Sequence, residues 1–353
     1  MNIAIDISPL KTGHYLQHRV RGTGFYLQNL CKALEENYPE NKYIYFKRGD
    51  KLKEKVDIFH YPYFEPFFLT LPLLQKNKTI ITVHDLTPLV FPNHFKAGAK
   101  GVVKWWIQRR SLRAASAIIT DSQSSKNDIV KYVDIEQTKI KVIYLAADPE
   151  FRILSSKEKL KQVREKYGLP QKFALYVGDA TWNKNLPRLI KASLKINIPL
   201  VMVGKALIGK EIDCQNSWNK DLLTVQKMAE GNRNIFRLGF ISKEDLIALY
   251  NAATVFAIPS LYEGFGLPVL EAMSCGCPVV TSKEGSLKEV AGEAAKYVDA
   301  HNTENIAEGI SEVFNSFNLQ KELSQKGLVQ SKKFTWEKTA LETNNLYKSV
   351  MNQ

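Results

Sequence analysis

The sequence predicts an α/β protein made of two Rossmann-like halves, each built on a doubly wound parallel sheet. Its 353 residues exceed what one hydrophobic core usually holds, and 44% of them are apolar. Short apolar runs alternate with helical patterns in both halves, which is typical of a parallel sheet covered on both faces. In the second half, four of these runs stop at a small or rigid residue, namely Gly178, Gly204, Gly239 and Pro259.

The first half is expected to occupy residues 1–150. Its opening apolar run, residues 2–8, is typical of a buried strand. A loop containing Gly22 and Gly24 is expected to lead into a helix over residues 25–34. The remaining elements follow in order: short strands near 46 and over 56–60, a strand over 78–83, a helix over 97–113, a strand over 117–120, a helix to about 132 capped by polar residues 121–125, and a strand over 139–144.

The second half is expected to occupy residues 151–335. Its predicted strands cover 173–177, 200–203, 235–238 and 255–258. A last helix over 336–353 carries its apolar residues at helical spacing, namely Trp336, Ala340, Tyr347 and Val350. Two such sheets that face each other would leave a crevice at the carboxyl ends of their strands, where open α/β sheets bind ligands.

Composition excludes several classes of protein. No stretch is apolar enough to cross a membrane, residues 1–11 lack the pattern of a secretion signal, and four cysteines make no disulfide framework. We therefore expect a cytoplasmic protein. The net charge of +13 fits acidic partners, such as phosphorylated small molecules or an anionic membrane surface. The basic residues are spread along the chain and form no known nucleic-acid module, so we expect no nucleic-acid partner.

The most informative segment covers residues 259–273. A loop with two glycines follows a predicted strand, and Pro268 suits the first turn of the next helix. The free amides and dipole of such a helix start favour an anion. Glu263 and Glu271 would repel an anion, so they fit a ligand that also offers hydroxyl groups, as a ribose or a sugar ring does. The alternative is one carboxylate that stabilises the helix start and one exposed loop acid.

Two further residues stand beyond the ends of predicted strands. Lys184 lies between the strand 173–177 and a helix that begins near Pro187, so it would project toward the anion. His84 follows the strand 78–83 and would point into the crevice. The alternatives are a solvated lysine and a structural histidine.

Two nucleotide-binding motifs are incomplete. Residues 204–211 nearly match a phosphate loop, but Glu211 replaces the Ser or Thr that binds Mg²⁺. Residues 22–27 form half of a dinucleotide fingerprint, because Leu27 replaces its third glycine. The chain has no Asp-x-Asp pair to hold a metal-bound diphosphate. We expect neither a metal ion nor a cofactor.

Residues 234–292 resemble the retaining GT-B glycosyltransferases of family 4, the glycosyl transferases group 1. The resemblance rests on Asn-Ile-Phe-Arg-Leu-Gly-Phe at 234–240 and on Pro-Ser-Leu-Tyr-Glu-Gly-Phe-Gly-Leu-Pro-Val-Leu-Glu-Ala-Met at 259–273. It extends over nearly the whole chain, through residues 3–10, 22–24, 83–86 and 184–185. The family implies a donor-binding C-terminal domain and an acceptor-binding N-terminal domain, onto which the last helix packs.

The resemblance also implies roles for single residues. Glu271 would hold the ribose hydroxyls of a nucleotide sugar, and Glu263 a hydroxyl of the transferred sugar. Lys184 would neutralise the diphosphate, and His84 would face the sugar near the reacting carbon. The other implied donor-binding residues are Gly22, Gly24, Gly178, Phe240, Gly264, Phe265, Gly266 and Leu267. The family's proposed front-face mechanism retains the anomeric configuration without an enzymic nucleophile or a metal.

The function expected from this resemblance is transfer of a hexose to a glycan or a lipid-linked acceptor in cell-envelope polysaccharide synthesis. Similarity of the N-terminal part to bacterial mannosyltransferases favours GDP-mannose as donor. One departure is that Asp179 and Asn183 stand where many relatives carry an arginine, a contact worth about 1.5–3 kcal/mol. Three alternatives stay open: a sugar-nucleotide epimerase, a non-catalytic scaffold of a polysaccharide assembly complex, and a dinucleotide oxidoreductase.

Two apolar segments of the first half suggest contact with lipid or acceptor. The predicted helix holds Trp105 and Trp106 among basic residues, so it would suit the inner face of an anionic membrane. The basic residues are Lys104, Arg109, Arg110 and Arg113. The alternative places the aromatic rings in the core and the arginines in water. Residues 61–74, rich in Phe and Pro, are expected to form a loop on the acceptor side.

Overall fold

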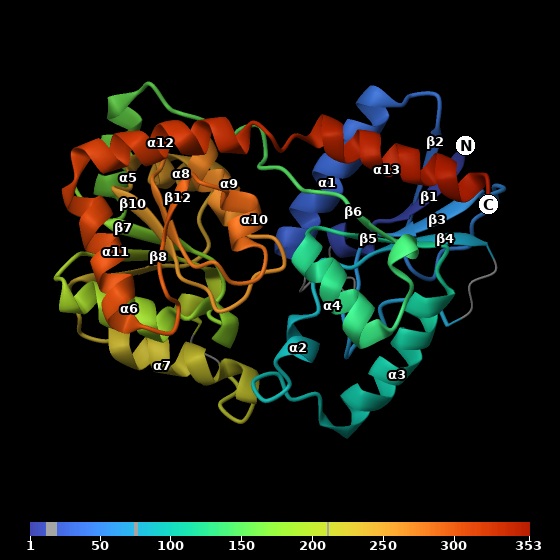
Figure 1. The fold of residues 1–353 in the computed structure, drawn as a ribbon, viewed down its shortest axis with the longest axis horizontal. Helices are drawn as coiled ribbons and strands as arrows, with labels where there is room; N and C mark the ends of the chain where they lie inside the picture. Colours follow the sequence, from blue (N-terminus) through green and yellow to red (C-terminus); the bar gives the residue numbers. More distant parts are fainter. Residues whose placement is uncertain (12–19, 74–76, 210–211) are drawn as a thin grey trace. The chain divides into compact units, whose positions relative to one another are not determined.

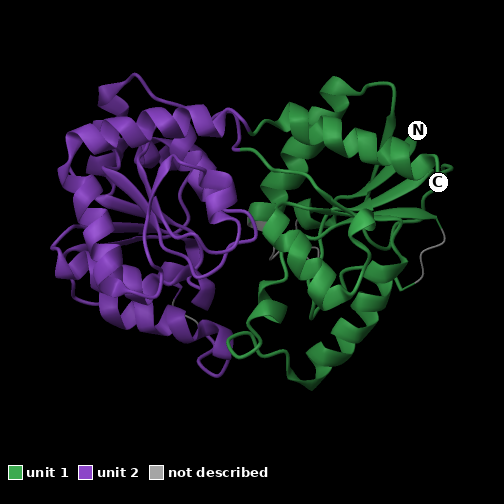
Figure 2. Cartoon of the chain, in the orientation of Figure 1, with its two compact units in different colours: residues 1–146, 334–353 green, residues 147–333 purple. Residues whose placement is uncertain are grey.

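The computed structural model describes residues 1–11, 20–73, 77–209 and 212–353. The chain forms two compact units (Figure 2). Unit 1 contains residues 1–146 and 334–353, and unit 2 contains residues 147–333. The boundaries predicted from the sequence stand at residues 150 and 335.

Unit 1 is built on a six-stranded parallel sheet with the order β2-β1-β3-β4-β5-β6. Its strands are β1 (Asn2–Asp6), β2 (Lys42–Phe46), β3 (Ile58–Tyr61), β4 (Lys78–Thr82), β5 (Ala117–Thr120) and β6 (Ile140–Val142). The central strands β1, β4 and β5 are buried along nearly their whole length. Continuous apolar runs suit strands that are covered on both faces, so the predicted parallel sheet is confirmed here.

Helices cover both faces of this sheet (Figure 1). The helices of unit 1 are α1 (Val20–Asn37), α2 (Thr87–Val90), α3 (Gly98–Ala114), α4 (Gln123–Val133) and α13 (Trp336–Met351), with 3₁₀ turns at Ser8–Leu10 and Gln137–Lys139. Figure 1 shows α1 and α13 on one face, and α3 and α4 on the other. Leu112 of α3 and Ile129 of α4 pack with Ile81 and Ile118 of the sheet in one apolar core.

Helix α13 belongs to unit 1 although unit 2 precedes it in the chain. It packs on α1, and its apolar face is buried, including Trp336, Ala340, Tyr347 and Val350. The hydroxyl of Tyr347 lies 2.7 Å from Nδ1 of His60 on β3. The face predicted from helical spacing is therefore the face that closes unit 1.

The prediction for Gly22 and Gly24 was wrong in one respect. Both residues lie in the first turns of α1, not in a loop before it. A glycine costs a helix about 1 kcal/mol relative to alanine, which is why the sequence favoured a loop. Packing of the following turns, where Leu27 and Leu30 are fully buried, outweighs this cost.

Unit 2 is built on a second six-stranded parallel sheet with the order β12-β11-β10-β7-β8-β9. Its strands are β7 (Ala174–Val177), β8 (Leu200–Val203), β9 (Ile235–Leu238), β10 (Val255–Ile258), β11 (Val279–Thr281) and β12 (Ala295–Tyr297). The four strands predicted from the sequence are β7 to β10, and they are confirmed. Strands β11 and β12, at one end of the sheet, are only three residues long, too short for a pattern to reveal.

Unit 2 also has helices on both faces of its sheet (Figure 1). They are α5 (Lys157–Lys166), α6 (Leu186–Lys195), α7 (Lys220–Ala229), α8 (Lys243–Ala252), α9 (Leu267–Ser274), α10 (Leu287–Ala291), α11 (Thr303–Asn315) and α12 (Phe317–Ser331), with 3₁₀ turns at Trp182–Lys184, Lys205–Ile208 and Ser217–Asn219. Helix α6 packs against α7 and α11, while α9 packs against α12 and α5 against α8. Across the described ranges, no helix has both the length and the apolar character needed to cross a membrane.

Candidate active site

Two loops meet at the carboxyl edge of the unit 2 sheet. They follow β7 and β10, which are neighbouring parallel strands, so both loops emerge at the same edge. The backbone N–H of Leu261 donates to the carbonyl of Asn183 at 2.7 Å. In return, the side-chain amide of Asn183 donates to the carbonyl of Tyr262 at 3.0 Å. These bonds hold the two loops in one fixed arrangement.

Asn185 anchors the loop that precedes α6. Its backbone is left-handed, with φ of 59°, a conformation that asparagine tolerates better than most residues. Its buried amide donates to the carbonyls of Pro259 and Ala300 at 2.8 and 2.7 Å. Asn185 therefore has a structural role next to Lys184, because it fixes the position from which the Lys184 side chain projects.

Lys184 and Glu263 form an ion pair between these loops. Nζ of Lys184 lies 2.8 and 2.6 Å from the two carboxylate oxygens of Glu263. The hydroxyl of Ser260 donates to Oε1 of the same carboxylate at 2.7 Å. Glu263 is only 6% exposed, so the alternative of an exposed loop acid is wrong. Both charges are held in place before any ligand arrives.

The backbone around Glu263 is packed against the turn before α10. Gly285 has φ of +61°, and a Cβ at this position would lie 2.5 Å from the carbonyl oxygen of Glu263. The backbone N–H and the hydroxyl of Ser286 lie 3.1 and 3.0 Å from that same oxygen. Only glycine fits at position 285. This close approach fixes the orientation of the peptide that carries Glu263.

The loop then opens into the N-terminus of α9. Gly266 precedes the helix with φ of +96°, and Pro268 occupies the first turn, as predicted. Within the described residues, no side-chain hydrogen bond caps this helix start. The first amides of a helix carry partial positive charge and bind anions. The glycine turn and the proline-led helix start predicted from the sequence are therefore present, and they follow Glu263 directly in the chain.

Glu271 lies in the second turn of α9 and is partly exposed. The hydroxyl of Tyr250 donates to its Oε2 at 2.9 Å. Burial raises the pKa of Glu271 to about 7, the charge of Asp148 acts in the same direction, and the bond from Tyr250 opposes them. This carboxyl group is therefore sensitive to pH near neutrality.

A histidine and an aspartate meet at the carboxyl edge of the unit 1 sheet. His84 and Asp121 follow β4 and β5, which are neighbouring parallel strands. Nδ1 of His84 donates to Oδ2 of the buried Asp121 at 2.7 Å. The ring of Tyr26 on α1 meets the imidazole edge-on at 4.9 Å. The hydroxyl of Ser125 donates to the carbonyl of His84 at 3.0 Å.

The environment of His84 favours its protonated form. Burial by itself would lower the pKa of the imidazole, but the Asp121 carboxylate outweighs it and the pKa is raised. Asp85 and a backbone hydrogen bond at Pro62 act in the same direction. Nε2 is buried. The ring is thus oriented through Nδ1 by Asp121.

Comparison with known proteins places the chain in a family. Residues 157–329 match the model of the Glycosyl transferases group 1, and residues 45–151 match that of Glycosyltransferase Family 4. The O-antigen chain mannosyltransferase B of Escherichia coli is 33% identical over 303 residues, which cover 83% of this chain and 75% of that protein. The chain belongs to the group 1 glycosyltransferases of family 4.

Two further comparisons extend this result. The serotype-specific mannosyltransferase WbdA of Escherichia coli is 30% identical over 270 residues, which are 74% of this glycosyltransferase but only 32% of WbdA. The crystal structure of HepE from Anabaena in complex with UDP-glucose superposes with a TM-score of 0.70 at 19% identity, over 99% of this chain and 100% of HepE. These likenesses confirm the predicted GT-B fold.

The other predicted donor residues of the glycosyltransferase lie in different surroundings. Gly178 has φ of +155°, and a Cβ there would lie 2.7 Å from the hydroxyl of Tyr176. Backbone conformation and packing therefore both favour glycine at position 178. Phe240 follows β9 and is 80% exposed. Among the residues that the structure describes, a Cβ at Gly22 would meet nothing within 4 Å.

The segment that nearly matches a phosphate loop does not form one. Residues Lys205–Ile208 form a short 3₁₀ helix after Gly204 instead of a loop around an anion. Lys210 and Glu211 lie outside the described residues. Within the described ranges, no group of three or more His, Cys, Asp or Glu residues could hold a metal ion.

Sequence reasoning missed the partners that orient the site. The cap predicted within residues 121–125 is Ser122, whose hydroxyl accepts from the N–H of Ser125 at 3.0 Å, whereas Asp121 bonds His84. The available signal was that Asp121 and His84 both follow predicted strands, which proved to be neighbours. Ser260 and Tyr250 gave no signal, because a single hydroxyl in a loop or helix forms no pattern.

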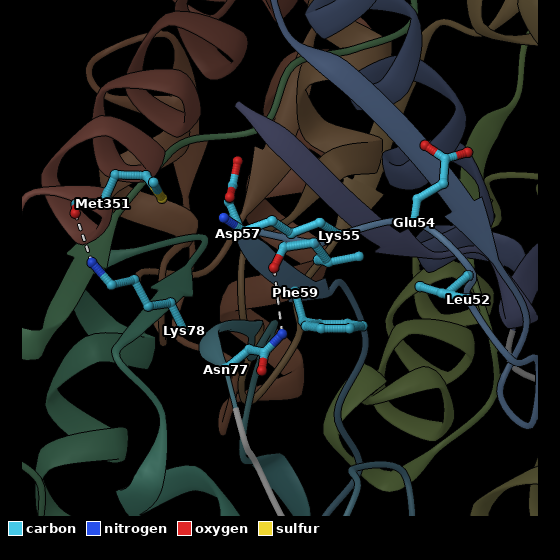
Figure 3. A pocket seen from close by; sticks show the side chains of 9 residues that line it. Leu52, Glu54, Lys55, Asp57, Phe59, Asn77, Lys78 and Met351 are labelled. Atoms are coloured by element: carbon cyan, nitrogen blue, oxygen red, sulfur yellow. Dashed lines mark hydrogen bonds between the residues drawn. The ribbon is translucent and has the colours of Figure 1, made fainter.

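A pocket of about 700 Å³ in unit 1 lies away from these residues (Figure 3). It is lined by Asp57, Phe59, Asn77, Lys78 and Met351, among others, at the amino ends of β3 and β4. Nζ of Lys78 donates to the carbonyl of Met351 at 2.6 Å. His84 stands at the opposite, carboxyl edge of the same sheet, so this pocket is no part of the candidate site.

Proposed function

We propose that this glycosyltransferase moves a hexose from a nucleotide diphosphate sugar to a hydroxyl group of a glycan or lipid-linked acceptor in polysaccharide synthesis. The transfer would retain the anomeric configuration and use no metal ion. Unit 2 binds the donor and unit 1 the acceptor. The observation that carries this proposal is the ion pair of Lys184 with the buried Glu263, which precedes the start of α9.

Each group of this site has a task in the proposed reaction. Departure of the nucleoside diphosphate develops negative charge, which the ammonium of Lys184 and the amides at α9 stabilise. Glu263 accepts a hydrogen bond from a hydroxyl of the transferred sugar, and Glu271 accepts from the ribose. His84 donates from Nε2 to the sugar. Gly264, Phe265, Gly266 and Leu267 supply the backbone of the donor loop, and Gly22, Gly24, Gly178 and Phe240 complete the proposed donor residues.

The names of two relatives support the proposed donor. The two Escherichia coli relatives are named mannosyltransferases, which favours GDP-mannose. HepE, which shares the fold, holds UDP-glucose in its crystal structure. Where many relatives have an arginine, this chain has the neutral Asn183, whose amide donates to the carbonyl of Tyr262. Lys184 therefore carries more of that task here.

The test is a binding screen followed by a product assay. Thermal shift against UDP-, GDP- and ADP-sugars identifies the donor, because a ligand that binds the folded state raises the melting temperature. With a mannosyl oligosaccharide panel as acceptors, we expect a glycoside product that keeps the donor's anomeric configuration and an unchanged rate in EDTA. An isomerised sugar formed without acceptor would indicate the epimerase, and binding without any turnover would indicate the scaffold.

The pKa of Glu271 makes a separate prediction about donor binding. The ionised carboxylate accepts hydrogen bonds from a ribose, so we expect the donor KM to rise as the pH falls through about 7. The substitution Tyr250→Phe removes the bond that opposes protonation, so this rise should begin at a higher pH. Initial rates over a pH series measure both effects. Identical KM profiles for the two proteins would contradict the role of Glu271.

A further inference from the structure

Two contacts hold the imidazole of His84 in unit 1. Nδ1 is bound to Asp121 at 2.7 Å, and the ring of Tyr26 stands nearly perpendicular to the imidazole, at 86° with the ring centroids 4.9 Å apart. A single hydrogen bond fixes the position of one atom, whereas a perpendicular ring contact also favours one ring plane. Tyr26 therefore contributes to the orientation of His84 what the bond to Asp121 alone does not.

Tyr26 is itself anchored by Thr82. Both side chains are buried, and their hydroxyl oxygens lie 3.1 Å apart. Thr82 is the last residue of β4 and stands two positions before His84. Alternate residues of an extended chain project to the same side. The segment that carries His84 therefore also carries the anchor of the ring that packs against it.

The anchor continues through β3 to helix α13. Nε2 of His60 lies 2.8 Å from Oγ1 of Thr82, and Nδ1 of His60 lies 2.7 Å from the hydroxyl of Tyr347. Burial, and with it the charge of His84, lowers the pKa of His60 to about 3. The His60 ring is therefore neutral and offers one donor and one acceptor nitrogen, so it can bond both neighbours without burying a charge.

Tyr26, Thr82, His60 and Tyr347 thus form a continuous hydrogen-bonded set, the buried polar row. Each of the four is at most 2% exposed. Apolar side chains of similar shape would fill a core at lower cost, because buried polar groups are costly unless they are paired. A fully paired network instead holds its members in one arrangement. The row therefore fixes a position, and the group at its end is the ring of His84.

We propose that the buried polar row positions His84 toward the transferred sugar, with Tyr26 as the positioning residue and Tyr347 of α13 as the far anchor. This inference rests on the proposed function, in which His84 faces that sugar. All four members of the row are buried, so they act through His84 and not on the substrate itself. The proposed contacts with the diphosphate and the ribose lie in unit 2. Loss of the row should therefore lower kcat and leave the donor KM nearly unchanged.

Variants of Tyr26 test the row by its effect on the rate. Tyr26→Phe keeps the ring and loses the bond to Thr82, whereas Tyr26→Leu loses both. We expect kcat to fall about threefold in Tyr26→Phe and about tenfold or more in Tyr26→Leu. Tyr43→Phe is the matched control in the same unit. The Tyr43 hydroxyl donates to the carbonyls of Leu34 and Tyr38 at 3.2 Å, outside the row, so this variant should keep the parent kcat.

A spectroscopic measurement makes the test independent of turnover. In protein labelled with ¹⁵N at histidine, the His84 Nδ1 proton is the downfield resonance that His84→Gln removes, because a hydrogen bond to a carboxylate is strong. We expect Tyr26→Phe and Thr82→Val to broaden this resonance. Thr79→Val changes the same type of residue on the same strand, where the hydroxyl donates to the carbonyl of Asn77 at 2.9 Å. This control should leave the resonance sharp.

The two measurements distinguish the outcomes. A sharp His84 resonance in folded Tyr26→Phe and Thr82→Val would overturn the inference, and so would a broadened resonance with an unchanged kcat. Equal losses in the two controls would also overturn it, because they would show a general loss of packing. A broadened resonance in a parent protein that transfers no sugar would support the positioning of His84 and reject the proposed function. If Tyr26→Leu does not fold, the other two variants decide, because each removes one hydroxyl and keeps the shape of the side chain.

Discussion

Replacing Lys184 by alanine is expected to lower the turnover of the nucleotide sugar about tenfold or more, which corresponds to about 1.4 kcal/mol of transition-state free energy. The ammonium group is held 2.6 Å from Glu263 beside the start of α9, where the charge of the departing diphosphate would develop. Initial rates of nucleoside diphosphate release measure this effect.

Two controls separate lost chemistry from lost folding. Lys195 on α6 pairs with Glu304 at 2.8 Å, but both side chains are more than half exposed, so Lys195→Ala should leave the rate unchanged. Removing Lys184 leaves the buried Glu263 carboxylate without its cation, which should lower the melting temperature. The double variant Lys184→Ala with Glu263→Gln should regain that stability without regaining activity. Normal turnover in a folded Lys184→Ala protein would reject the proposed role.

The second large effect is expected from Asp121→Asn. The carboxylate holds His84 by Nδ1 and raises the pKa of its imidazole. Protonated His84 is the form that donates from Nε2 while Nδ1 stays bound, so activity should fall as the pH rises through this pKa. Without the carboxylate, that decline should begin at a lower pH, and turnover near neutrality should fall about tenfold or more.

Asp134 provides the matching control for this substitution. It is an acidic residue of the same unit, but it is exposed and pairs with Arg113 on the surface. Asp134→Asn should therefore keep the parent pH profile. His84→Gln should abolish the loss of activity at rising pH. Adding Asp121→Asn to this variant should lower its activity little further, because Asp121 acts through the histidine. If the Asp121→Asn variant had the same pH profile as the parent protein, the contact of Asp121 with His84 would be merely structural.

The sheets could be predicted from the sequence, but the edges of elements could not. Strands β7 to β10 follow from their apolar runs, because a strand buried on both faces needs such a run. Helix α1 starts before Gly22 because later packing compensates for a poor local propensity. The three-residue strands β11 and β12 exist only because neighbouring strands supply their hydrogen bonds.

The same distinction between local and long-range features applies to the candidate site. Glu263, Glu271 and the helix start could be predicted, since they share one local segment. The pairing of Glu263 with Lys184 joins residues 79 positions apart, and no pattern in either loop contains it. The burial of Glu263 and the contact of His84 with Asp121 depend on which strands become neighbours. Only the folded chain specifies that.

The position of α13 also determines the order in which the molecule can be completed during synthesis. Unit 2 is one continuous segment, so its sheet can form as soon as residue 333 has left the ribosome. Unit 1 contains residues 1–146, yet His60 and the face of α1 that packs on α13 are completed only by residues 334–353, which follow unit 2 in the chain. Unit 1 of this enzyme is therefore the later one to mature, and removal of α13 would destabilise it first.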